Sequence, residues 1–176
     1  MSHRIYSLQQ IQTWDEAWCL RFNRASTHLP VRKTFRLISR LGDGIFWYCL
    51  MLWLLMRYQS AALLPVLHMV AAGLVCTILY KWLKHKTHRL RPYNKNPGIS
   101  CVTAPLDQFS FPSGHTLHAV AFSVVALAYY PALAWLLLPF TALVAISRLV
   151  LGLHYPSDVL AGIVIGATIA GLSLGF

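Results

Sequence analysis

The chain has 176 residues, of which 57% are hydrophobic and only 11% are charged. A soluble domain carries about a quarter charged residues, so this deficit argues against a soluble protein and indicates a membrane protein. The 15 Lys and Arg residues outnumber the five acidic residues, which suits a nucleic acid, an anionic lipid surface or a phosphorylated substrate. We exclude nucleic acid, because the sequence offers no polar domain to present a binding face.

The first predicted element is an amphipathic helix over residues 7–26. Its apolar side chains fall within one arc at about 100° per residue, although Asp15 lies close to that arc. A helix lying in the membrane interface and a helix packed against a bundle both fit this pattern. A basic stretch follows and ends at the Gly-Asp-Gly sequence 42–44, so residues 1–43 form a basic N-terminal segment.

Five apolar segments follow and predict a transmembrane core over residues 44–176. They cover residues 44–58, 61–82, 115–131, 132–147 and 157–175. Several are shorter than the ~20 residues that a spanning helix needs, so they either borrow flanking residues or lie in a locally thinned bilayer. A polar loop over about 83–114 separates the second segment from the third, and loops of this length are often functional.

These elements predict an all-α polytopic membrane bundle of about five transmembrane helices, preceded by an amphipathic helix. We expect residues 1–176 to form one domain. The crossings bring the ends of the second and fourth segments, and the starts of the third and fifth, to one membrane face. Those four places hold Lys84, Arg91, Ser113, Gly114, His115, Arg148, His154 and Asp158. Their convergence favours a functional site, because ionisable residues at membrane depth are costly.

Each of these residues also has a structural explanation when it is taken alone. Lys84 and Arg91 would then be interfacial anchors, and Ser113 and Asp158 would be ordinary helix-capping residues. As a group they suit a phosphate. Arginine binds two phosphate oxygens at once, and a helix that begins at Ser113 presents free amides to an anion.

The two histidines of this group suggest different chemical roles. His115 is placed to donate a proton at the start of a helix. Asp158, four residues after His154, is expected to accept a hydrogen bond from one of its ring nitrogens. The other nitrogen of His154 would then be unprotonated and nucleophilic.

Three blocks of sequence carry a resemblance to a known family. They are KHKTHRLRP at 84–92, PSGH at 112–115 and SRLVLGLHYPSD at 147–158. The chain resembles the type 2 phosphatidic acid phosphatase superfamily, whose signature is KxxxxxxRP, PSGH and SRxxxxxHxxxD. All three blocks occur in order with no signature position substituted, and the resemblance covers residues 75–176 closely.

The resemblance implies a role for each matching residue. His154 would attack phosphorus and form a phosphohistidine, Asp158 would orient His154, and His115 would protonate the leaving oxygen. The remaining signature residues would hold the phosphate: Lys84, Arg91, Ser113, Gly114 and Arg148. The resemblance implies no metal and no cofactor. Only Asp107 and Asp158 lie near the site as ligands for a hard cation, too few for a typical Mg²⁺ cluster.

We therefore expect a membrane lipid phosphatase, with undecaprenyl diphosphate as the favoured substrate and membrane lipids as its surroundings. One alternative is a phosphatidate or phosphatidylglycerophosphate phosphatase. Another, of a different class, is a non-catalytic lipid-phosphate binder or transporter. Counting basic residues, with Arg57 the clear exception, favours a cytoplasmic site. The resemblance implies a multi-pass protein of the cell membrane with its site on the periplasmic or outer face, which is the placement we expect.

Overall fold

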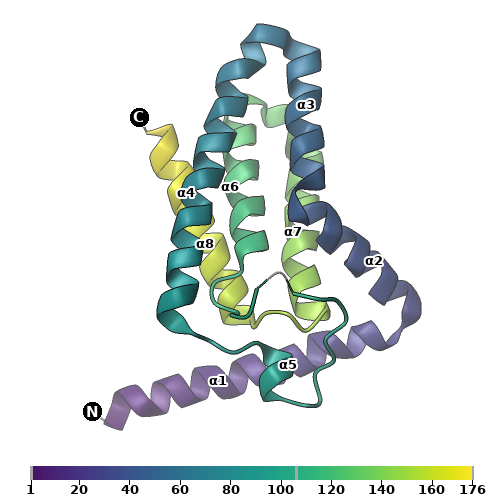
Figure 1. Ribbon diagram of the computed structural model, residues 1–176, viewed down its shortest axis with the longest axis vertical. Coiled ribbons are helices and arrows are strands. Elements are labelled where there is room, and N and C mark those ends of the chain that lie inside the picture. Colours follow the sequence, from purple (N-terminus) through teal and green to yellow (C-terminus); the bar gives the residue numbers. More distant parts are fainter. Residues whose placement is uncertain (1, 106, 176) are drawn as a thin grey trace.

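The computed structural model describes residues 2–105 and 107–175, with side chains from Gln9 onward, and its long elements are all helices. Each of the five predicted apolar segments corresponds to one helix of an upright bundle (Figure 1). These are α3 (Phe46–Tyr58), α4 (Leu63–Thr87), α6 (Gly114–Tyr129), α7 (Ala134–Val150) and α8 (Pro156–Leu174). Helices α4 and α7 end at the lower end of the bundle in Figure 1, where α6 and α8 begin, as the crossing count predicts.

In the part of the chain that the structure describes, three helical stretches are long and apolar enough to cross a membrane. The stretch Leu29–Thr87 is one of them and contains both α3 and α4, which fold back on each other at the top of the bundle (Figure 1). The others are Pro131–Val150 and Pro156–Leu174, while α6 is apolar but has only 16 residues. The prediction of an all-α membrane helix bundle is therefore confirmed.

The predicted start of the long loop, residue 83, is wrong. Helix α4 continues to Thr87 and ends at His88, whose left-handed conformation has a φ of 47°. A one-turn helix, α5 (Pro92–Lys95), then lies within the loop. In the sequence, the basic residues after position 83 predict a loop because they are polar. They also suit the last turn of a helix, whose dipole favours positive charge. Lys84 is therefore held on a helix.

Helix α1 (Ser2–Asn23) crosses the lower end of the bundle (Figure 1), so the predicted amphipathic helix is present but ends three residues early. Its buried face is not the apolar arc. Asp15, Cys19 and Asn23, spaced four residues apart, face the protein, whereas Trp14 and Trp18 stay 46% and 37% exposed. The helix therefore packs on the bundle through a narrow, largely polar stripe and leaves its tryptophans outside.

A π-helical turn (Leu41–Ile45) joins α2 (Leu29–Arg40) to α3. Gly44 within it has a φ of 133°, a conformation that side-chain-bearing residues rarely adopt. This bend carries α2 away from the axis of α3 (Figure 1). The Gly-Asp-Gly sequence thus forms a sharp corner between α2 and α3, and it places Asp43 at the edge of the bundle interior.

Helices α6 and α8 approach each other closely because two glycines of α8 face the backbone of α6. A Cβ atom on Gly162 would lie 2.8 Å from the carbonyl oxygen of Ser113, and one on Gly166 would lie 2.4 Å from that of Leu117. The backbone N–H of Ser113 also donates to the carbonyl of Asp158 at 3.0 Å. The first turns of α6 and α8 are consequently fixed against each other.

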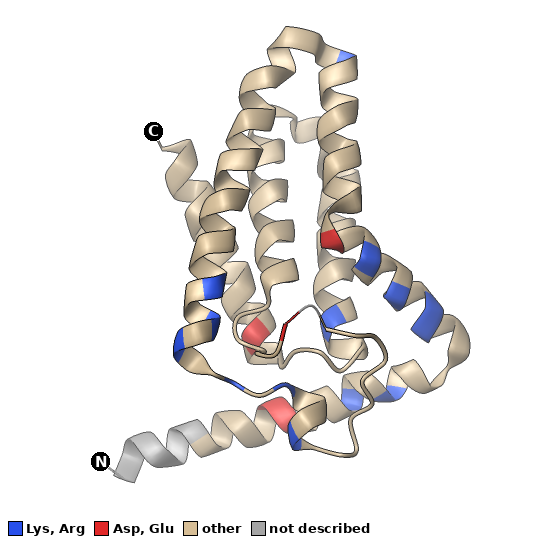
Figure 2. Cartoon of the chain, viewed as in Figure 1, with Lys and Arg blue, Asp and Glu red and all other residues tan. Residues whose placement is uncertain are grey.

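Charge is concentrated at one end of the molecule. Figure 2 shows the positions of Lys and Arg gathered on α1, α2 and the end of α4, around the lower loops. Among the residues described, Arg57 is the exception, since it lies in the last turn of α3 at the opposite end of the bundle. The polar face that the sequence predicts is therefore a physical feature of the fold.

Candidate active site

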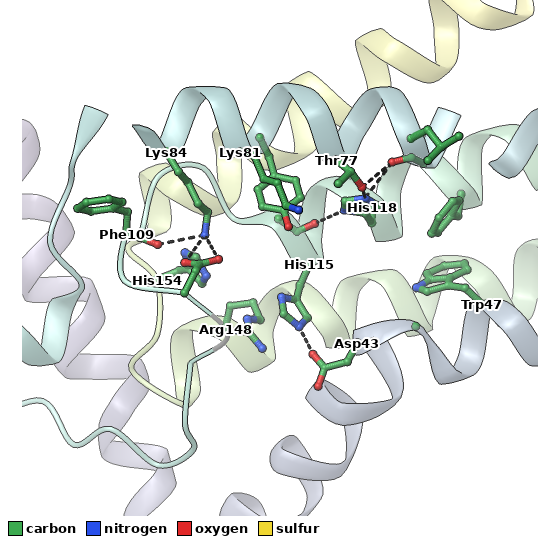
Figure 3. Close-up of a pocket in the computed structure, with 18 of the residues that line it drawn as sticks. Asp43, Trp47, Thr77, Lys81, Lys84, Phe109, His115, His118, Arg148 and His154 are labelled. Carbon is green, nitrogen blue, oxygen red and sulfur yellow. Dashed lines mark hydrogen bonds and ion pairs between the residues drawn. The ribbon is translucent and has the colours of Figure 1, made fainter. Parts of the chain in front are cut away.

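A cavity of about 810 Å³ lies between α3, α4 and α6, and its polar end holds most of the predicted site residues (Figure 3). The residues that line it include Lys84, Arg91, Gly114, His115, Arg148 and His154. Ser113 and Asp158 do not line it and are fully buried behind them. Away from the charged end the walls become apolar, with Trp47, Met51, Leu74 and Phe122. The cavity can thus accept a charged group at one end and an apolar chain at the other.

His154 lies in the short loop between α7 and α8 and is 1% exposed. Its Nε2 is 3.4 Å from Nη1 of Arg91. Burial and the neighbouring charges, first Arg91 and then Arg148, hold the pKa of this imidazole well below its usual value. The ring is therefore neutral near pH 7, which is the form that carries a nucleophilic lone pair.

The predicted hydrogen bond from His154 to Asp158 is not formed in this structure. Nδ1 of His154 is 3.7 Å from Oδ2 of Asp158, within ion-pair range but too long for a hydrogen bond. The oxygens of Asp158 have other partners: Oδ2 accepts the backbone N–H of Tyr155 at 2.9 Å, and Oδ1 accepts Nη1 of Arg89 at 2.7 Å. These bonds set the rotation of the carboxylate and leave His154 beside it.

Lys84 and Arg91 both bind the carboxylate of Asp107. Nζ of Lys84 is 2.7 Å from each carboxylate oxygen, and Nη2 of Arg91 is 2.8 Å from Oδ1. Burial alone would raise the pKa of Asp107, but the hydrogen bond and charge of Lys84, together with those of Arg91, outweigh it and lower that pKa. An ionised carboxylate therefore sits among cations that the sequence assigned to phosphate.

His115 projects from the first turn of α6, and its Nε2 contacts the carboxylate of Asp43 (Figure 3). Asp43 comes from the Gly-Asp-Gly corner between α2 and α3, more than seventy residues earlier in the chain. Because Nε2 is engaged with Asp43, Nδ1 is the ring nitrogen of His115 that this contact does not use. The predicted proton donor thus has an acidic partner that the sequence analysis did not assign.

Arg148 lies in the last turn of α7 and is 3% exposed. One guanidinium nitrogen, Nη1, donates to the hydroxyl of Ser39 on α2, and the side chain borders the cavity close to His115 (Figure 3). Helix α2 therefore helps to fix the third predicted phosphate-binding cation. A fork of donors in this position suits an anion with several oxygens.

Ser113 occupies the position before α6, as predicted, but its side chain does not cap the helix. Its hydroxyl pairs with the hydroxyl of Thr116 at 2.9 Å, and its backbone N–H is bound to Asp158. The helix start is instead held by neighbouring α8. Gly114, the first residue of α6, lies at the cavity wall and places backbone next to the charged end.

Sequence reasoning missed several side chains that contact the predicted residues, among them Ser39, Asp43, Arg89 and Asp107. Arg89 falls at an unspecified position of the first signature block, and Asp107 was considered only as a metal ligand. The Gly-Asp-Gly corner was the one available signal for Asp43. Among the side chains of residues 9–105 and 107–175, no three His, Cys, Asp or Glu cluster in a way that could hold a metal ion.

A helical membrane bundle with a buried histidine, a second histidine and three basic side chains around one cavity defines a class of phosphate-handling membrane proteins. Residues 61–176 match the family described as the PAP2 superfamily. The chain belongs to this superfamily, which confirms the resemblance found in the three sequence blocks.

Two curated relatives and one solved structure illustrate this similarity. An undecaprenyl-diphosphatase of Sulfolobus acidocaldarius is 35% identical over 108 residues, covering 60% of this chain and 52% of the relative. The chain thus matches about half the length of that protein. Phosphatidylglycerophosphatase B of Bacillus subtilis is 30% identical, covering 92% of this chain and 76% of the relative.

The structural comparison supports the fold. The crystal structure of a transmembrane PAP2-type phosphatidylglycerolphosphate phosphatase from Bacillus subtilis superposes with a TM-score of 0.70. It has 24% sequence identity and covers 95% of this chain and 86% of its own. The apolar helices, together with membership of the PAP2 superfamily, identify the chain as a membrane protein.

Proposed function

We propose that the chain is an integral membrane lipid phosphatase that hydrolyses a lipid phosphate or diphosphate through a phosphohistidine, with undecaprenyl diphosphate as the favoured substrate. The observation that carries the proposal is the position of His154. It is a buried, neutral imidazole next to Arg91, in a cavity that His115 and Arg148 also line. A binding protein would need the cations but not two histidines at the same end of the cavity.

In the first half of the reaction, Nε2 of His154 attacks phosphorus and the bond from phosphorus to the leaving oxygen breaks. His115 gives its proton to that oxygen, and the lipid product leaves. Arg148, Arg91 and Lys84 bind the phosphoryl oxygens and balance the charge that develops on them, while the backbone at Ser113 and Gly114 lies alongside.

In the second half, His115 takes a proton from water, which attacks the phosphohistidine. The bond from phosphorus to Nε2 breaks, inorganic phosphate leaves and His154 is again neutral. Asp158 supports the positive charge that forms on the imidazole. For a direct hydrogen bond, the distance of 3.7 Å between Nδ1 and Oδ2 must shorten to about 3.0 Å, a movement within the range of a side-chain adjustment.

The apolar part of the cavity supports a lipid as the substrate. Phe122 of α6 and Trp47 of α3 continue the walls away from the charges, where a hydrocarbon chain would be shielded from water. The name of the Sulfolobus relative supports a polyprenyl diphosphate. The second candidate, phosphatidylglycerophosphate, is supported by the Bacillus relative, whose similarity extends over 92% of the chain.

Phosphate release by purified protein in detergent, in the presence of EDTA, tests the proposal. The substrates are undecaprenyl diphosphate, phosphatidate and phosphatidylglycerophosphate. We expect metal-independent release from at least one of them, and His154→Ala should abolish turnover while inorganic phosphate still binds. Arg148→Ala should weaken both. Phosphate binding without release from any of the three lipids would favour the binder or transporter instead.

We further propose that residues 1–176 act as one unit in the cell membrane, with the site on the periplasmic or outer face. The family resemblance supports that face, whereas the Lys and Arg residues at the lower end of the bundle (Figure 2) favour the cytoplasm. Cys101 is an endogenous reporter, because it is exposed in the loop between α4 and α6, whereas Cys19 and Cys76 are buried.

A membrane-impermeant maleimide added to intact cells should label Cys101 if the proposed face is right. Cys49 is exposed on α3 but lies within an apolar span, so Cys101→Ser should remove the signal. Labelling that requires cell lysis would place the site on the cytoplasmic face.

A further inference from the structure

Arg89 joins three parts of the chain through its guanidinium group. Nη1 donates to Oδ1 of Asp158 and to the hydroxyl of Ser157, both at 2.7 Å, and Nη2 donates to Oδ2 of Asp15 at 2.6 Å. These four residues are called the Arg89 network below. It connects the loop after α4, the first turn of α8 and the middle of α1.

Both carboxylates of the Arg89 network are completely buried, whereas the Arg89 side chain is 24% exposed. Two buried carboxylates at one helix start would repel each other, and the single guanidinium between them is their shared counter-charge. A planar fork suits this task because its separate N–H groups can serve two acceptors at once. The guanidinium also lies over the ring of Tyr155, with 4.2 Å between its carbon and the ring centre.

Asp15 contributes a second fixed point at the same helix start. Its Oδ1 accepts the backbone N–H of Ser157 at 3.0 Å, and its Oδ2 accepts the Ser157 hydroxyl at 2.5 Å. An amide in the first turn of α8 is therefore satisfied by a side chain from α1, as a capping residue would do from within the chain. Asp15 is the residue that did not fit the apolar arc of α1.

The Arg89 network is directed at Asp158 rather than at the cavity. Arg89 is absent from the cavity lining, unlike Arg91 two residues later. It holds Oδ1 of Asp158, and the Tyr155 amide holds Oδ2, the oxygen nearest to Nδ1 of His154. The rotation of the Asp158 carboxylate therefore determines which of its oxygens lies next to Nδ1 of His154.

We propose that Arg89 and Asp15 are positioning residues that orient Asp158 behind His154, so that α1 is a working part of the catalytic site. The inference rests on the proposed phosphohistidine reaction and extends it to a helix outside the matched residues 61–176. A group that acts through Asp158 affects the step in which charge forms on His154. It leaves the cations that bind the phosphate untouched.

The chain supplies a matched pair of variants for the test. Asp15→Asn and Glu16→Gln are neighbouring carboxylate-to-amide changes on α1. Glu16 pairs with Lys95 at 2.9 Å on the partly exposed surface, where side-chain exposures are 31% and 42%. Both variants remove one ion pair between α1 and the segment that follows α4 and change the net charge equally, but only Asp15 also binds Ser157 and reaches Asp158 through Arg89.

The measurement is kcat and KM for the best lipid substrate, together with competitive inhibition by inorganic phosphate. Asp15→Asn and Arg89→Gln should each lower kcat by about tenfold or more, with KM and phosphate inhibition within about twofold of the unchanged chain. Arg89→Lys should recover part of the kcat lost in Arg89→Gln. The double variant should be little worse than either single one, because both act through one carboxylate. Glu16→Gln should match the unchanged chain.

The outcomes separate this inference from the proposed function. If the unchanged chain releases no phosphate, the proposed function fails and the positioning role fails with it. If it turns over and the Arg89 and Asp15 variants keep their kcat, only the inference is overturned. A fall in kcat that merely follows the loss of folded protein in thermal unfolding, or that Glu16→Gln reproduces, would also overturn it. Should Asp15→Asn fail to fold, Arg89→Lys, which keeps the charge, decides the matter through its kcat and KM.

Discussion

The carboxylate of Asp107 lies against the ammonium group of Lys84, with 2.7 Å between Nζ and each of its oxygens. Lys84 is also bound to the carbonyl of Phe109 at 3.0 Å, and Arg91 shares the same carboxylate. The loop between α4 and α6 thus places its own anion where the first signature block is expected to bind a phosphate. A substrate phosphate must then compete with Asp107 for these cations.

Removing this competition should strengthen anion binding. We expect Asp107→Asn to lower the inhibition constant of inorganic phosphate by about threefold to tenfold, because Lys84 and Arg91 lose a charged partner. Glu16→Gln, with the same change in net charge, is the control for non-specific attraction. Weaker phosphate inhibition in Asp107→Asn would mean that Asp107 organises the two cations rather than competing for them.

The lowered pKa of Asp107 gives a pH dependence of stability with a defined sign. Because folding lowers this pKa below the ordinary 3.8, the ionised carboxylate stabilises the fold at pH values above about 4. That contribution is lost as the pH falls through the lower folded value. The difference in thermal stability between the unchanged chain and Asp107→Asn should therefore be constant from about pH 5 to 8 and shrink below pH 4. A difference that grows on acidification would contradict this.

The contact between Asp43 and His115 predicts a dependence on the leaving group. If Asp43 orients the proton donor, Asp43→Asn should lower kcat about tenfold or more for a lipid monophosphate, whose alkoxide leaving group needs a proton. The loss should be much smaller for p-nitrophenyl phosphate, whose phenolate leaves unprotonated. Equal losses for both substrates would assign Asp43 to the fold instead, and His115→Ala provides the reference pattern.

Two glycines of α8 offer a matched test of the close contact between α6 and α8. Gly166→Ala places a Cβ 2.4 Å from the carbonyl of Leu117 and should destabilise the protein by about 1–3 kcal/mol through overpacking. Nothing lies within 4 Å of a Cβ at Gly171, so Gly171→Ala should leave stability unchanged or slightly raised. Thermal unfolding of both variants in detergent measures the difference, and equal melting temperatures would refute the role of Gly166.

The sequence was sufficient for the bundle and for six of the residues at the charged end of the cavity, because hydropathy and the number of crossings decide which segment ends share a face. It was insufficient for the partners of those residues. Asp43, Arg89 and Asp107 act across distances that no local pattern encodes, and two of them lie between signature positions. Asp15 was visible as an exception to the apolar arc of α1, yet only the fold shows that this exception is the buried contact.

Helix ends were the other weak point, for a physical reason. Hydropathy falls after residue 82, where the predicted span ends, but the helical hydrogen bonding of α4 continues to Thr87. The predicted bond between His154 and Asp158 was reasonable from their spacing of four residues. It is absent because Arg89 and the Tyr155 amide, neither of them considered for the site, bind the same carboxylate.

The close approach of α6 and α8 at Gly162 and Gly166 also divides the site into two parts, one of which is held more rigidly than the other. His115 and Asp158 stand on helices whose first turns are joined backbone to backbone, so that part moves as one body. Lys84, Arg91 and Asp107 belong to the end of α4 and the loop after it, and they are tied to one another by side-chain ion pairs. When a substrate phosphate replaces Asp107, Lys84 and Arg91 would therefore adjust their positions around it, while His115 and Asp158 stay in place.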